Sequence, residues 1–207
     1  MLGKIGTCCL LLGAICWGQT SACPITLTIN GAEGDATNVS TKTIVFVAIH
    51  EWVSASGPRP NLAMHDFYFQ PGGQPPGATF EVQHPSQDPG QNITKLEPVY
   101  VQFADGTTWG DSTAIPAYQM ADLNQGRSNG KEFYQGAISA YNQGGDTGLA
   151  NYLTTASQTP HDAPTEQAVP NMRNLGKKYL KIQQTSGSTA AISEIQSHLD
   201  AAKGRNF

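Results

Sequence analysis

The sequence predicts a mainly β protein with added α structure: an antiparallel β-sandwich over residues 23–112, followed by a helical extension over 113–207. Two patterns carry this prediction. Apolar residues alternate with a period of two as far as Trp109, in short runs separated by glycine and proline. After Asp111 the apolar period becomes that of a helix. With 207 residues, the chain is long enough to bury a sizeable core.

The strongest strand prediction is the run TKTIVFVAIHEWV, residues 41–53. Every second residue from Ile44 to Trp52 points to one face, the residues between them point to the other, and both faces are apolar near the middle. A strand that is buried on both sides has this pattern. Weaker alternating runs predict further strands at residues 25–30, 64–70, 78–83 and 96–103.

The segment FADGTTW, residues 103–109, closes the strand region. Its Asp105-Gly106 pair predicts a tight hairpin of type I′. This hairpin and the rhythm of short strands over residues 24–112 resemble those of the immunoglobulin-like (Ig-like) and fibronectin-like sandwiches of exported bacterial proteins. The resemblance implies an Ig-like pair of sheets and carries over no functional residue. The chain lacks the Cys…Trp…Cys pattern of antibody-type domains.

The second half of the chain contains three segments with a helical pattern. In residues 129–143 one stripe carries Phe133, Ala137 and Tyr141, and 147–156 predicts a second short helix after a glycine break. Residues 188–204 predict a third helix that ends at its last glycine. Between them, residues 157–170 contain three prolines and little to bury, which predicts a proline-rich linker.

Residues 1–22 have the features of a signal peptide: Lys4, then an apolar run, then small residues before a cut. Cys23 follows, and it would be the single cysteine of the mature chain, which leaves no internal disulfide. Two interpretations stay open. The segment resembles a bacterial lipobox, in which Cys23 receives the lipid, although Thr20 stands where Leu, Val or Ile is usual. An ordinary signal peptidase would also cut after Ala22.

No motif of the chain predicts catalytic residues, a cofactor or a metal. No two of the five histidines have the i, i+3 or i+4 spacing that places two imidazoles on one helical face. The G-x-S-x-G elbow of a serine hydrolase and the D-x-D-x-D-G start of a calcium loop are both missing.

The residues that best fit ligand binding are aromatic. Trp52, Tyr100 and Trp109 come from different predicted strands and would form a platform for sugars or peptide side chains if they shared an open face. His50 and His65 are the polar candidates beside them. The competing interpretation places each of these side chains in the core or at its ends.

These observations predict an exported, non-catalytic protein, periplasmic, on the outer envelope or extracellular, that acts through binding or as a structural module. Its partner would be a protein or a glycan, and lipid on Cys23 would anchor it to a membrane. The alternative is a secreted hydrolase with a site between sandwich and helices. A net charge of -4 argues against nucleic-acid binding, which needs clustered Lys and Arg.

Overall fold

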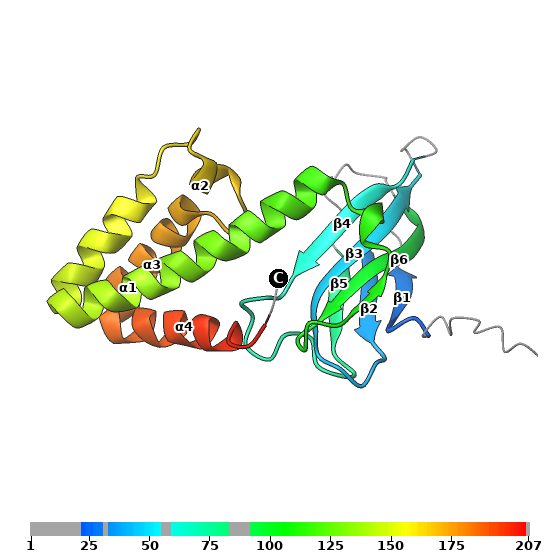
Figure 1. Ribbon diagram of the computed structural model, residues 1–207, viewed down its shortest axis with the longest axis horizontal. Helices are drawn as coiled ribbons and strands as arrows, with labels where there is room; N and C mark the ends of the chain where they lie inside the picture. Colours follow the sequence, from blue (N-terminus) through cyan, green and yellow to red (C-terminus); the bar gives the residue numbers. More distant parts are fainter. Residues whose placement is uncertain (1–21, 31–32, 55–58, 83–91, 206–207) are drawn as a thin grey trace, which may run out of the picture.

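The structure is a computed structural model that describes residues 22–30, 33–54, 59–82 and 92–205. The predicted signal peptide lies outside these residues except for Ala22. Within the described part, strands come first and helices follow, which confirms the predicted order of elements. Figure 1 shows the strands at one end of the molecule and the helices at the other.

The seven described strands form two antiparallel sheets. The first sheet has the order β1 (Ile25–Asn30), β2 (Glu33–Asn38), β5 (Thr79–Val82). The second sheet has the order β4 (Asn61–Asp66), β3 (Ile44–Val53), β6 (Ile93–Phe103), β7 (Thr108–Gly110). The strand predicted at residues 64–70 ends earlier than expected, because Tyr68 and Phe69 leave the sheet and join the helices.

One hydrophobic cluster, called here the inter-sheet cluster, joins residues of both sheets. It consists of Ile25, Ala36, Ile44, Val47, Ile49, Ala63, Val82, Val101 and Phe103. On the other face of β3, Phe46 and Ala48 pack against Ile115 and Leu123 at the start of the helical region. The middle of β3 is therefore buried on both faces, as its sequence predicts.

The hairpin between β6 and β7 has the predicted position but not the predicted turn type. Gly106 has φ +81° and its N–H donates to the carbonyl of Phe103 at 3.0 Å, while the N–H of Phe103 donates to the carbonyl of Thr107. A type I′ turn needs positive φ at both central residues, and no described residue other than glycine has one. Asp105 instead accepts hydrogen bonds from the backbone and hydroxyl of Thr107.

A short 3-10 helix, η1 (Ser112–Ala114), leads from the sheets to the helices. The helices are α1 (Ala117–Ser157), α2 (Pro164–Gln167), α3 (Met172–Ser186) and α4 (Ser188–Ala201). The helix α1 turns at Gly145, whose φ of 56° and ψ of -143° are not helical, so the predicted glycine break is confirmed. No helix among the described residues has the length and apolar character needed to cross a membrane.

The helices enclose a second core, called here the helical cluster. Phe133 and Leu153 of α1, Tyr179 of α3 and Ile195 of α4 are fully buried in it. Because Tyr68 and Phe69 of the segment after β4 belong to the same cluster, the helices are packed against the strand region and not merely tethered to it.

The segment 157–170, expected to be a linker, contains α2 and contacts α1 closely. An added Cβ at Gly126 would lie 1.6 Å from the carbonyl oxygen of Val169, and one at Gly130 would lie 3.1 Å from the Pro170 ring. Two glycines on one side of α1 thus let this segment approach the helix backbone.

Candidate functional site

The five residues predicted to bind ligand lie on two different faces of the second sheet. His50 and Trp52 alternate with buried residues on β3, and Tyr100 of β6 pairs with Ala48, so these three share the face turned toward α1. His65 pairs with Val47 and Trp109 pairs with Val101, which places both on the face turned toward the first sheet. The five side chains therefore do not form one platform.

Trp52 is half-buried and covered by a lysine. The ammonium of Lys95 lies 4.3 Å from the Trp52 ring centroid, and His50 meets the same ring edge-on at 5.9 Å. Lys95 also donates to Glu97 at 2.7 Å, and this hydrogen bond holds the pKa of the Glu97 carboxyl below its usual value. The Lys95 ammonium thus covers one face of the Trp52 ring, which reduces the surface on which a sugar could stack.

Tyr100 and His65 belong to packed clusters. Tyr100 packs against Phe46 with a centroid distance of 6.1 Å, and burial raises the pKa of its phenol. His65 is stacked with Phe67 at 6.4 Å and tilted against Phe80 at 5.5 Å, and burial lowers the pKa of its imidazole. Among the described residues, no group of three or more His, Cys, Asp or Glu side chains could hold a metal ion.

Between the second sheet and α1 lies a polar cluster that the sequence does not predict. Arg127 of α1 is 1% exposed. Its Nη2 donates to Asp66 at 2.8 Å and its Nη1 donates to Gln102 at 2.9 Å. The guanidinium carbon lies 4.6 Å from the Tyr68 ring centroid. This junction, where a hydrolase site was the alternative prediction, is filled by paired and packed side chains.

The C-terminal segment contacts the same region. The hydroxyl of Tyr68 donates to the carbonyl of Arg205 at 2.7 Å. In return, Nη1 of Arg205 donates to the carbonyls of Phe67 and Tyr68, and burial lowers the pKa of its guanidinium. The described end of the chain is thus held against the segment that follows β4.

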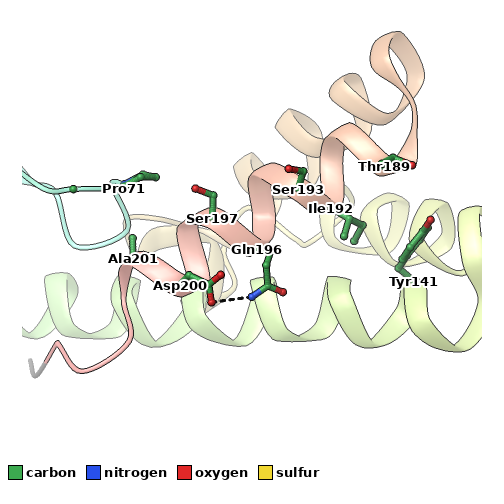
Figure 2. Close-up of a pocket in the computed structure, with 10 residues that line it drawn as sticks. Pro71, Tyr141, Thr189, Ile192, Ser193, Gln196, Ser197, Asp200 and Ala201 are labelled. Atoms are coloured by element: carbon green, nitrogen blue, oxygen red, sulfur yellow. Dashed lines mark hydrogen bonds between the residues drawn. The ribbon is translucent and has the colours of Figure 1, made fainter.

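Two hollows outside the junction are candidate binding sites. The larger, of about 720 Å³, runs along α4 and is shown in Figure 2. The smaller, of about 380 Å³, lies beside Cys23 at the other end of the fold and is lined in part by Val39, Phe103 and Trp109. Of the five residues predicted to bind ligand, Trp109 alone is among the described residues that line these two hollows. Trp109 also packs against the inter-sheet cluster.

The thiol of Cys23 is exposed, and its Sγ lies 3.1 Å from the carbonyl oxygen of Ile25. Only Pro24 separates this cysteine from β1, so the folded body begins directly after it.

In comparisons with known protein families, with curated proteins and with solved structures, nothing matches this chain.

Proposed function

We propose that this chain is an exported, non-catalytic binding protein of the cell envelope, anchored by lipid on Cys23. The observation that carries the non-catalytic part is the junction at Arg127. A site between sheets and helices needs an opening there, and the junction instead holds a guanidinium that is 1% exposed and bonded to Asp66 and Gln102. This packing also makes the strand and helix regions one body.

The surface around Cys23 supports the proposed anchor. Val39, which is 54% exposed, and the half-buried Trp109 line the hollow beside the cysteine. Partly exposed valine and tryptophan side chains beside polar ones suit the boundary between lipid and water, where tryptophan is favoured. In Figure 1 the chain enters β1 at the end of the molecule away from the helices. An anchored molecule would therefore present its helices outward.

We also propose that the two sheets are an Ig-like sandwich of the fibronectin kind. With β1, β2 and β5 taken as strands A, B and E, and β3, β6 and β7 as C, F and G, the orders β1-β2-β5 and β3-β6-β7 follow the constant-type immunoglobulin pattern. The difference is β4, which pairs with β3 in the second sheet and not with β5 in the first. Backbone NMR contacts between β3 and β4, such as Ala48 with Met64, would test this topology, and contacts between β4 and β5 would contradict it.

The anchor is tested by expression in a bacterium fed with an alkyne fatty acid. The parent chain should be labelled and sediment with membranes, and its N-terminal peptide should carry lipid mass on Cys23. Cys23→Ser should lose the label and accumulate unprocessed precursor. Cys16→Ser, within the predicted signal peptide, is the matched control and should keep the label. A soluble mature protein with an unmodified Cys23 would refute the anchor and leave ordinary secretion.

A further inference from the structure

We infer that the groove between α1 and α4 is the ligand site of this protein and that its ligand is a neutral oligosaccharide. This inference rests on the proposed binding function and adds to it a place and a ligand class. The groove consists of the hollow of about 720 Å³ along α4 and an adjoining one of about 320 Å³. Gln196 lines both, so they form one elongated surface.

The groove is built from regular positions on two helices. Ile192, Gln196 and Asp200 are spaced four residues apart on α4, so they lie on one side of that helix. Figure 2 shows these three side chains on the side of α4 that faces α1, with Tyr141 extending from α1 near the end of α4 that carries Thr189. Helix geometry therefore sets the spacing of these three groups, and Pro71 and Gly72 of a loop complete the lining.

Beside apolar side chains such as Ile192 and Leu199, the lining includes many hydroxyl and carboxamide groups. Such groups both donate and accept hydrogen bonds, as the hydroxyls of a sugar do. Those that line the two hollows come from both helices. They include Ser139, Asn142 and Gln143 on α1 and, on the side of α4 turned away from α1 in Figure 2, Ser193 and Ser197. A pyranose has hydroxyl groups around its rim and C–H groups on its faces, so a lining that mixes polar and apolar groups suits a sugar.

The groove is close to electrically neutral. Asp200 is the one charged side chain among the described residues that line it. The carboxylate of Asp200 accepts from Lys203 at 2.6 Å and from the Gln196 amide at 3.0 Å, and these hydrogen bonds hold its pKa below the usual value. Because no described lining residue is Lys or Arg, phosphates and acidic glycans lack a counter-charge here.

Two features would lower the cost of binding a sugar. The Gln196 amide donates to Asp200 and the Gln143 amide donates to Ser139 at 2.9 Å, so both side chains are held by their own helix before a ligand arrives. Tyr141 packs partly against the helical cluster and keeps part of its ring exposed in the groove. An aromatic ring held in this way offers an apolar face to the C–H side of a pyranose.

The test is isothermal titration calorimetry of the mature protein, purified after the expressing cell has processed its N-terminus. The neutral probes are maltohexaose, cellohexaose and chitohexaose. A hexagalacturonate serves as the acidic counterpart. At least one neutral hexasaccharide should bind with a millimolar or tighter dissociation constant, and the acidic one should bind more weakly. Tyr141→Ala and Gln196→Ala should each weaken the binding at least about tenfold. Tyr118→Ala, which alters a tyrosine that is 65% exposed at the start of α1, should leave it unchanged.

Tyr141→Ala could weaken binding by disturbing the fold, because Tyr141 packs against the helical cluster. Gln196→Ala controls for this effect, because Gln196 lies outside that cluster. Absence of binding by all three neutral probes would overturn the inference, and so would binding that survives both groove substitutions. If the probes fail while the parent still carries lipid on Cys23, the saccharide site is wrong and the anchor stands. If a probe binds through Tyr141 and Gln196 while Cys23 is unmodified, the anchor fails and the site stands.

Discussion

Arg127 of α1 and Asp66 of β4 form a bidentate ion pair across the junction of helix and sheet. Nε donates to Oδ2 at 3.2 Å and Nη2 donates to Oδ1 at 2.8 Å. The arginine side chain is 1% exposed and the aspartate side chain 22% exposed. These two residues are 61 positions apart in the chain, so their pairing links the helical region to the strands.

Asp66→Ala should lower the free energy of unfolding by about 3 kcal/mol, since it leaves a buried guanidinium without its carboxylate. The low end of the range for broken buried pairs applies because Asp66 is partly exposed. Urea denaturation followed by circular dichroism measures the loss. Glu97→Gln, which breaks the exposed pair with Lys95, is the matched control and should cost less than about 1 kcal/mol. Equal losses in both variants would contradict the role given to Arg127.

The contact between Gly126 and Val169 leads to a second prediction. An alanine at Gly126 would bring its Cβ within 1.6 Å of the Val169 carbonyl oxygen, so Gly126→Ala should displace the segment 157–170 from α1. Limited proteolysis should then cut in that segment much faster than in the parent. Gly144, also in α1, has open space around its Cα. Gly144→Ala should leave the proteolysis rate unchanged, and rapid cleavage of both variants would count against the contact.

The sequence predicts best those elements whose burial shows in their own residues. The strand β3 was placed correctly because its apolar residues are dense and alternate. The strand β2 was missed because its sequence is EGDATN, and its buried positions are Gly34, Ala36 and Asn38. Small and polar residues of this kind are buried only because neighbouring strands cover them, and the sequence of β2 alone does not show this. The helix α3 was also missed, although Leu175, Tyr179 and Ile182 at i, i+4 and i+7 were a usable signal.

The candidate sites were harder to predict than the fold. An arginine in a helix is usually exposed, so Arg127 gave no signal without knowledge of Asp66. The aromatic residues of the strands predict a binding platform on the sheet. In the structure, however, the Lys95 ammonium lies over the Trp52 ring, and Tyr100 packs against Phe46. The α4 side of the groove is rich in serine, threonine and glutamine, whose pattern in the sequence resembles that of any solvated helix face.

Burial of His65 predicts a pH dependence of stability. Its folded-state pKa is lowered from the ordinary value of 6.5, and its Nε2 has no hydrogen-bond partner among the described residues. The unfolded chain therefore takes up this proton at a higher pH than the folded protein does. The stability that His65 contributes should be fully present above pH 6.5 and lost as the pH falls from 6.5 toward the folded pKa.

The variant His65→Phe isolates this effect, because all other titrating groups are common to parent and variant. Its free energy of unfolding, relative to that of the parent, should rise as the pH is lowered from about 7.5 to about 5. Urea denaturation at each pH measures the difference. A difference that stays constant over this range would show that His65 titrates alike in the folded and unfolded states.

Substitutions at Trp109 and Trp52 compare a tryptophan that packs against the core with one that lies at the surface. Both are half-buried, but Trp109 packs against the inter-sheet cluster opposite Val101, whereas Trp52 contacts Lys95 and His50. Full burial of a tryptophan makes truncation to alanine cost about 3–5 kcal/mol. Because part of the Trp109 ring is exposed, we expect Trp109→Ala to cost about 2 kcal/mol.

Trp52→Ala removes a ring that contacts the Lys95 ammonium but belongs to none of the three hydrophobic clusters, so it should cost less than about 1 kcal/mol. Urea denaturation of both variants measures the contrast, and acrylamide quenching of the parent should leave Trp109 the better protected ring. Trp109→Phe keeps an aromatic ring opposite Val101 and should recover much of the loss. If Trp52→Ala proved as costly as Trp109→Ala, the outer face of β3 would be as important to the fold as the inter-sheet cluster, and the assignment of Trp109 as the core residue would be wrong.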